Sequence, residues 1–231
     1  DWVGNMPDYS LQLLIGAGIT LLLGVCSAVF ALTAATALLL LGQLKSRVIN
    51  AFIRVYSIFI RGVPEILVIL VTFFGAAVIL TKISGSYAEL SPFFAGVLAL
   101  GLVFTAYTYE VLRGAFEAIP KGQFEAGQTL GLSGTQTFFH IIYPQLLQRA
   151  LPGLSNLWLI LLKETSLVSV IGLEELMRKS SLAAGVKHDP LFYYCYGALF
   201  YLAITAFSEV ALKRVTTRVN RHMAPVKSKE N

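Results

Sequence analysis

The chain has 231 residues, of which 56% are hydrophobic and 13% are charged, with a formal net charge of +5. A soluble domain has about 45–50% apolar and about 25% charged residues. The composition therefore excludes an ordinary soluble domain and indicates a polytopic membrane protein. In such a protein, cationic loops orient the membrane helices, so the positive charge does not indicate nucleic-acid binding.

Five stretches are apolar and long enough to cross a bilayer, which takes about 20 residues. In chain order, the predicted spans are residues 11–41, 55–80, 92–112, 151–171 and 191–212, with approximate ends. Phe138–Leu147 is also apolar, but it is about half a span long and Pro144 interrupts it, so we place it at the membrane interface. We expect residues 1–231 to form a single all-α transmembrane domain.

Five spans put the two termini on opposite sides of the membrane, and the cations are distributed unevenly between the alternate loops. The cation-rich set contains Lys45, Arg47, Arg54, Arg113, Lys121, Arg149 and the tail residues Lys213, Arg214, Arg218, Arg221, Lys227 and Lys229. The cation-poor set contains Lys82, Arg178, Lys179 and Lys187. The positive-inside rule predicts an N-terminus outside and a cytoplasmic C-terminus. Aromatic residues near the outer ends of the spans agree, namely Trp2, Tyr9, Tyr87, Tyr193 and Tyr194.

A cytoplasmic loop at about residues 121–145 has the pattern of two short helices joined at a glycine. Ile119-Pro120 ends the preceding helix. Gly131 suits the left-handed position after a helix end, and Ser133 can cap the helix that follows.

The first short helix carries an acid and an apolar pair. Glu125 lies near its start, where the helix dipole favours a negative charge. Ala126 and Leu130 are four residues apart and share a face. A solvated helix needs no apolar face, whereas a helix that docks in a groove of a partner does. The loop is therefore predicted to transmit force to a soluble partner.

The segment EAGQTLGLSGTQTFFHIIYPQ (Glu125–Gln145) resembles the EAA loop of ABC-importer permeases. Three further segments resemble the polar amino-acid uptake branch of that family: AYTYEVLRGAFEAIPKGQFEA (106–126), LPGLSNLWLILLKETSLVSVIGLEEL (151–176) and FIRGVPEILVIL (59–70). The resemblance covers about residues 50–220. One departure is Gly127, where the family usually has Ala, and it is expected to loosen the short helix by about 1 kcal/mol.

The resemblance implies a type I ABC-importer permease fold, in a multi-pass protein of the bacterial inner membrane. It also implies a dimeric pore, a cytoplasmic ABC ATPase dimer that holds the loop in a groove, and a periplasmic amino-acid-binding protein that delivers substrate. The residues that match the docking motif are Glu125, Ala126, Gly127, Leu130 and Gly131. The sequence contains no GxxxxGK[ST] phosphate loop. ATP and Mg²⁺ are therefore expected on the ATPase, with no enzymatic activity and no cofactor in this chain.

An ionisable residue within a membrane span raises the free energy of insertion by about 2.5–3.5 kcal/mol, so each one is a functional candidate by default. Asn156, Lys163 and Glu164 lie at i, i+7 and i+8 and share a helical face. Two interpretations remain open for this face. Lys163 can pair with an acid such as Glu110 and fix the bundle, or Glu164 and Asn156 can contact the substrate. Ser166 lies next to these residues, where a Thr-Ser pair permits bending, and is also taken as a substrate contact.

Glu65 follows a Gly-Val-Pro break and is the clearest indication of the substrate. Permeases for arginine, histidine, lysine and ornithine resemble this chain in having an acid at that place, and a carboxylate would balance a guanidinium or ammonium group. The structural alternative pairs Glu65 with Arg61 or Arg54. Glu110 matches a position that is acidic throughout the amino-acid branch, so a structural role is predicted for it, together with Lys163.

These observations predict a permease subunit of an ATP-driven, binding-protein-dependent importer of basic L-amino acids. A hetero-oligomeric pore is favoured over a homodimer. The alternatives are a permease for another polar amino acid and a self-sufficient secondary transporter, which would need paired halves with broken helices. No catalytic constellation is found, and the three histidines, His140, His188 and His222, are too scattered for a metal site.

Overall fold

The computed structural model describes residues 9–44 and 46–221. Trp2, Lys45, the side chain of Arg221 and the basic tail from His222 onwards, with Lys227 and Lys229, lie outside this description. The described residues form helices and no strand. The elements are α1 (Tyr9–Gly42), α2 (Arg47–Gly62), α3 (Glu65–Ser84), α4 (Pro92–Glu117), α5 (Lys121–Thr129), α6 (Gly134–Thr137), the π-helix η1 (Phe138–Ile142), α7 (Tyr143–Glu164), the 3₁₀-helix η2 (Thr165–Ile171), α8 (Leu176–Lys187) and α9 (Pro190–Arg221).

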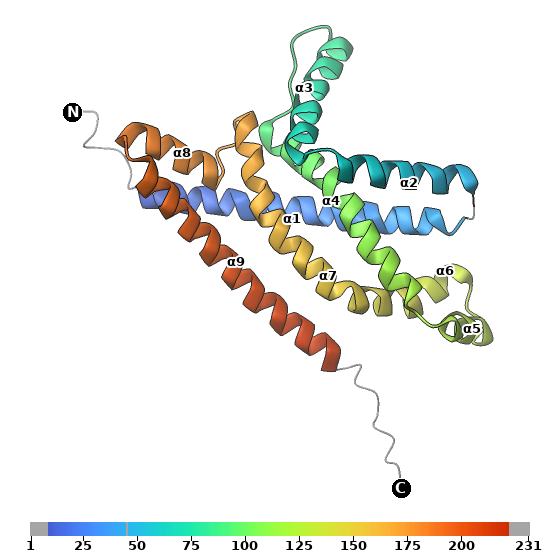
Figure 1. Cartoon of the computed structure of the whole chain (residues 1–231). Helices are drawn as coiled ribbons and strands as arrows, with labels where there is room; N and C mark the ends of the chain where they lie inside the picture. The colour runs from blue at the N-terminus through green and yellow to red at the C-terminus, as the bar shows by residue number, and fades with distance from the viewer. Residues whose placement is uncertain (1–8, 45, 222–231) are drawn as a thin grey trace.

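Five helical segments are long and apolar enough to cross a membrane, as predicted. They comprise α1, α3, α4, the continuous run Gly134–Ile171 and residues Pro190–Val219 of α9. Figure 1 shows α5 and α6 at the opposite end of the molecule from α8. The side of the membrane on which each end lies remains a prediction.

The second span differs from the continuous helix expected over residues 55–80. It is divided into α2 and α3, which meet at a sharp bend (Figure 1). Pro64 disfavours the helical conformation in the residue before it, and Val63 is extended with φ −104° and ψ 135°. Glu65 is therefore the first residue of the membrane-spanning helix rather than a residue in its middle.

Phe138–Leu147 does not form a separate interfacial segment. Pro144 lies directly after the π-helix η1, and a π-helical turn is one of the places where a continuous helix accommodates an interrupted hydrogen-bond ladder. The π-helix η1 joins α6 to α7 without a break. Phe138, Ile142 and Leu146 are buried in a cluster with residues of α1 and α4. Their apolar face packs inside the protein, which the length of the segment alone did not indicate.

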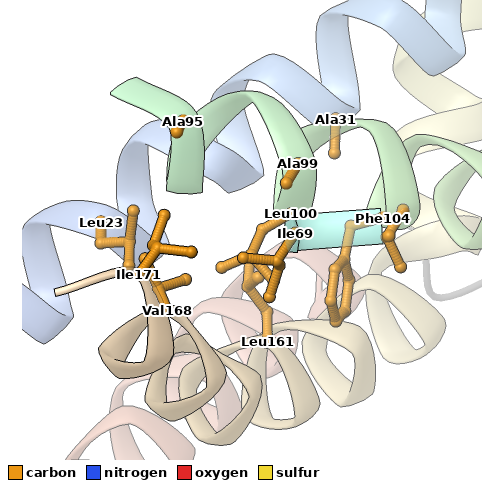
Figure 2. Close-up of a cluster of buried hydrophobic side chains, with 11 residues drawn as sticks. Leu23, Ala31, Ile69, Ala95, Ala99, Leu100, Phe104, Leu161, Val168 and Ile171 are labelled. Atoms are coloured by element: carbon orange, nitrogen blue, oxygen red, sulfur yellow. The ribbon is translucent and has the colours of Figure 1, made fainter. Parts of the chain in front are cut away.

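Helix α4 is the centre of the bundle and packs most closely on α1. Figure 2 shows part of the core, where Ala95, Ala99 and Leu100 of α4 meet side chains from α1, α3, α7 and η2. Small residues allow the backbones to approach: a Cβ at Gly101 would lie 2.5 Å from a ring carbon of Phe30. This packing holds the helices that carry the charged residues described below.

Candidate functional site

The loop predicted to dock on a partner forms a compact helical knob, defined here as α5 and α6 with the turn between them (residues 121–137). Gly131 has φ +72°, in the left-handed region that favours glycine. Its N–H donates to Gln128 O at 2.9 Å, and the N–H of Leu132 donates to Gly127 O at 3.1 Å. These two bonds form a Schellman motif, which satisfies the last carbonyl groups of α5. The left-handed conformation predicted for Gly131 is confirmed.

The second helix of the knob begins with a complete capping box. The Ser133 hydroxyl accepts from Gln136 N–H at 3.3 Å, and Gln136 Oε1 accepts from Ser133 N–H at 2.9 Å. The predicted cap at Ser133 is confirmed. Both ends of the turn are therefore held by hydrogen bonds that lie within the knob itself.

Gly127 has a packing role that the sequence interpretation missed. It is the one buried residue of α5, and a Cβ added there would lie 2.4 Å from Thr137 Cγ2 and 2.6 Å from its Oγ1. The expectation that Gly127 merely loosens the helix is therefore incomplete, because the missing side chain is what lets α5 lie against α6.

The other predicted docking residues are exposed. Glu125, Ala126, Leu130 and Gly131 all face out of the chain, and Leu130 is 73% exposed. Phe124 points the other way and packs on Phe116 of α4 with ring centroids 5.7 Å apart. The knob thus presents an apolar residue at its tip and is anchored by an aromatic contact at its base.

A second anchor connects the knob to α7. The side-chain amide of Gln145, in the first turn of α7, donates to Gln123 Oε1 of α5 at 2.9 Å and to Ile141 O at 3.0 Å. Helix α7 ends at Glu164, about 28 Å further along the axis at about 1.5 Å per residue. One helix therefore carries the anchor of the knob at one end and a candidate substrate residue at the other.

The structure brings Glu65 and Glu164 together. Glu65 begins α3 and accepts a hydrogen bond of 3.3 Å from the hydroxyl of Tyr107 on α4. Glu164 ends α7 and is close enough to Glu65 for the two half-buried carboxylates to repel each other. We call these three residues the acid cluster. Tyr107 was not expected, because only its position in the fold shows that it faces Glu65.

Ser166 lies just beyond the acid cluster, in the 3₁₀-helix η2. Its hydroxyl donates to Lys163 O at 2.7 Å, which leaves its lone pairs available as acceptors. The change of helix type at Glu164 marks a local irregularity of the kind found at hinges and functional positions.

Asn156 does not join the acid cluster. It lines a cavity of about 440 Å³ between α7 and α9, together with Glu209 and Lys213 of α9. Eight residues separate Asn156 from Glu164, which places the two about 12 Å apart along the helix axis. The structure therefore separates residues that the helical periodicity grouped.

Lys163 does not form the ion pair proposed for it. Its side chain is exposed and has no ion pair within the described part of the chain. Glu110 instead pairs with Arg61 of α2 at 3.3 Å and with Arg113 of α4 at 2.8 Å. Glu110 therefore joins α2 to α4, and the structural alternative that paired Glu65 with Arg61 is not found.

Glu175 is a buried acid that the sequence interpretation overlooked, since it considered only acids within predicted spans. It is 0% exposed and caps α8: its carboxylate accepts from Met177 N–H at 2.9 Å and Arg178 N–H at 2.8 Å. It also accepts from the hydroxyl groups of Tyr201 at 2.7 Å and Thr20 at 3.3 Å. Burial raises the pKa of Glu175, against the effect of these hydrogen bonds. An acid just before a helical run is the sequence signal that would have found this cap.

The comparisons with known proteins agree with the fold. Residues 27–221 match the family model described as "Binding-protein-dependent transport system inner membrane component". The arginine ABC transporter permease protein ArtQ of Haemophilus influenzae is 41% identical over 220 residues, which covers 95% of this chain and 99% of the relative. The histidine/lysine/arginine/ornithine transport system permease protein HisQ of Salmonella typhimurium is 34% identical and covers 88% of this chain and 91% of the relative.

Two solved structures share the architecture. A crystal structure of an amino acid ABC transporter with histidines has a TM-score of 0.77 and 27% identity, and covers 91% of this chain and 95% of that chain. An inward-facing MetNI methionine ABC transporter has a TM-score of 0.71 at 16% identity, with 93% and 99% covered, and supports the fold alone.

Proposed function

Because the chain belongs to the family of binding-protein-dependent transport system inner membrane components, we propose that it is the permease subunit of an ATP-driven importer of basic L-amino acids in the bacterial inner membrane. Relatives named for arginine, for histidine, lysine, arginine and ornithine, and for octopine support this substrate class. ATP hydrolysis belongs to a separate ATPase subunit, so this chain is not itself an enzyme.

The observation that carries the substrate assignment is the pair of carboxylates at Glu65 and Glu164. Two acids that repel each other in a partly dehydrated site are unfavourable when the site is empty. A guanidinium or ammonium group placed near both would remove that repulsion and form charge-assisted hydrogen bonds. The Tyr107 hydroxyl orients Glu65 from α4. An uncharged amino acid would leave the repulsion offset only by the charge of the neighbouring Lys163, which favours basic substrates over other polar ones.

The knob supports the proposed partner on the cytoplasmic side. Its exposed face, made by Glu125, Ala126, Leu130 and Gly131, suits the groove of an ABC ATPase dimer, while Gly127 lets the two short helices lie together. The Gln123–Gln145 contact then passes movement of the knob to α7, whose far end carries Glu164. This chain supplies one half of a pore, completed by a second permease, which we propose to be a different chain. A periplasmic amino-acid-binding protein delivers the substrate.

The assignment can be tested by arginine uptake into proteoliposomes that contain the complete importer. Glu65→Gln and Glu164→Gln are each expected to lower arginine uptake at least ten-fold, on the order of the contribution of one charge-assisted hydrogen bond. Glu209→Gln is the matched control, because Glu209 is an exposed acid that pairs with Lys213 on α9. A substrate profile unchanged by both cluster variants would remove the basic-substrate assignment. Uptake that persists without the ATPase would favour a secondary transporter.

A further inference from the structure

Helix α2 is a basic amphipathic helix whose two faces have different surroundings. Arg47, Arg54 and Arg61 are seven residues apart, a spacing that places them on one helical face. The opposite side is apolar and uncovered in this chain, with large exposed side chains at Val48, Phe52, Val55 and Phe59. This combination is typical of a helix that lies at the surface of a membrane.

The basic face of α2 borders a cavity of about 490 Å³ between α2 and α4. Arg54 and Arg61 of α2 and Arg113 of α4 line it, with Glu110 as the one acid. Three guanidinium groups against one carboxylate leave the lining with a formal charge of +2. Arg61 and Arg113 bind Glu110, and Arg113 also pairs with Glu117 at 2.7 Å, outside the lining. Arg54 has no ion pair or hydrogen bond from its side chain within residues 9–44 and 46–221, so it is the guanidinium group that the fold leaves without an acid. The cavity therefore holds positive charge that the fold does not neutralise.

A second observation in the same cavity also points to ligand binding. Ser57 lines it and is 2% exposed, yet its hydroxyl has no hydrogen-bond partner. A buried unpaired hydroxyl costs about 1–3 kcal/mol. Ser57 follows Arg54 by three residues, so the two side chains are neighbours on the helix. The arginine side chains that line the cavity and the unpaired Ser57 hydroxyl together suit an anion with several acceptor oxygens.

We propose that this cavity binds the phosphate of an anionic phospholipid, with Arg54 and the Ser57 hydroxyl as its donors. Arginine holds phosphate through a planar fork of donors, which gives strong charge-assisted bonds. Glu110 keeps Arg61 and Arg113 in place at the edge of the site. Ile58 lines the cavity and is 62% exposed, so it gives an acyl chain an apolar surface to cover next to the phosphate, which a free anion would not need. Basic pockets between membrane helices on the cytoplasmic side bind such headgroups, and the predicted orientation puts the site on that side.

The test uses the complete importer in nanodiscs of phosphatidylcholine with a rising fraction of phosphatidylglycerol, followed by mass spectrometry of the lipids retained. The wild-type protein is expected to retain phosphatidylglycerol selectively. Arg54→Gln is expected to raise the half-saturating fraction about five-fold, the contribution of one arginine near a membrane surface. Ser57→Ala should raise it about three-fold, the contribution of a single hydrogen bond. Arg47→Gln is the matched control, since it removes the same charge from the same helix outside the cavity.

Equal effects of Arg54→Gln and Arg47→Gln would show that only surface charge matters and would overturn the site. Displacement of the lipid by millimolar inorganic phosphate would assign the cavity to a free anion instead of a lipid. A crosslink from position 54 to the second permease, without retained phosphatidylglycerol, would assign it to the subunit interface. Because Arg54 is exposed and unpaired, its replacement leaves the fold intact, so each result bears on binding.

Discussion

The knob and the acid cluster differ in how completely the chain satisfies its own polar groups. In the knob, the Schellman turn at Gly131 and the capping box at Ser133 satisfy the backbone groups at the helix ends, and the Thr137 hydroxyl is the one buried side-chain group there without a partner within the described residues. In the acid cluster, Glu65 and Glu164 repel each other, and within the described residues the Glu65 side chain accepts a single hydrogen bond, of 3.3 Å from the Tyr107 hydroxyl. The helix ends of the knob are therefore satisfied within this chain, whereas we propose that a cationic ligand completes the acid cluster.

Glu175 shows that the small number of hydrogen bonds in the acid cluster does not follow from how far apart its residues lie in the sequence. Its partners Thr20 and Tyr201 are also remote in sequence, at 155 and 26 residues, yet its carboxylate accepts four hydrogen bonds. Remote contacts therefore do not by themselves make a site incomplete. A buried acid with its hydrogen bonds made has a structural role, and an acid with its hydrogen bonds unmade is a candidate for binding.

Glu175→Ala is expected to have the largest effect on stability. It removes the cap of α8 and leaves four donors without an acceptor, which should lower the free energy of unfolding by about 3 kcal/mol or more. Heating in detergent, followed by chromatography of the folded fraction, measures the loss. Glu174→Ala is the control, because Glu174 is exposed and pairs only with Lys179, a contribution of about 0–1 kcal/mol. Equal losses for both variants would contradict the role of Glu175.

Gly127→Ala is expected to disturb the knob by about 2 kcal/mol, because the added methyl group would overlap Thr137. ATP-driven uptake should fall while the amount of protein in the membrane stays the same. The double variant Gly127→Ala/Thr137→Ala removes the overlapping atoms and should recover most of the activity. If the double variant were no better than the single one, the close packing of α5 on α6 would not be the reason for the glycine.

Gly131→Val tests conformation without a clash, since no atom lies within 4 Å of a Cβ added there. A β-branched residue at φ +72° is strained by about 1–2 kcal/mol, so the turn should open and coupling should weaken. Hydrogen exchange at the N–H groups of Gly131 and Leu132 would report the opening. Gly131→Asn is the control, because Asn tolerates this conformation. Equal exchange in the two variants would argue against a strained turn.

Tyr107→Phe is expected to have the smallest effect, because its hydrogen bond to Glu65 is long. The Michaelis constant for arginine should rise about two- to five-fold, the range for a weak neutral donor, with little change in maximal rate. Initial rates of arginine uptake over a range of concentrations separate the two quantities. A fall in maximal rate at an unchanged Michaelis constant would place Tyr107 in the moving machinery rather than beside the substrate.

Structural features that depend on residues close in sequence could be predicted. Contacts that depend on residues far apart in sequence, and so on how the helices pack, could not. The five spans, the left-handed Gly131 and the Ser133 cap depend on residues within a few positions of one another. The pairing of Glu110 with Arg61, rather than of Lys163 with an acid, depends on how α2 packs against α4. Helical periodicity grouped Asn156 with Glu164, but it gave no information on depth along the helix or on the neighbouring helix that each side chain meets.

Even the knob contains one contact that local rules miss. Gly127 and Thr137 meet across a turn, whereas helix propensity alone indicates only that a glycine destabilises the helix. The break before Glu65 shows the opposite case. The Val63-Pro64 dipeptide is a local signal for this break in the helix, but the apolar residues on either side suggested a single span. At Pro64, the apolar pattern predicts a continuous helix and the proline predicts a break. The structure has the break, so the backbone restriction prevailed.

Photocrosslinking at the tip of the knob tests the proposed coupling most directly. A photoreactive residue is placed at Gln128, which is exposed on α5, and another at Lys187, which is exposed on α8 at the opposite end of the molecule. In native membranes, position 128 should form an adduct with the ATP-hydrolysing subunit and position 187 should not. Absence of that adduct at position 128, or labelling of that position by an impermeant reagent from outside the cell, would contradict a force-transmitting contact at this loop.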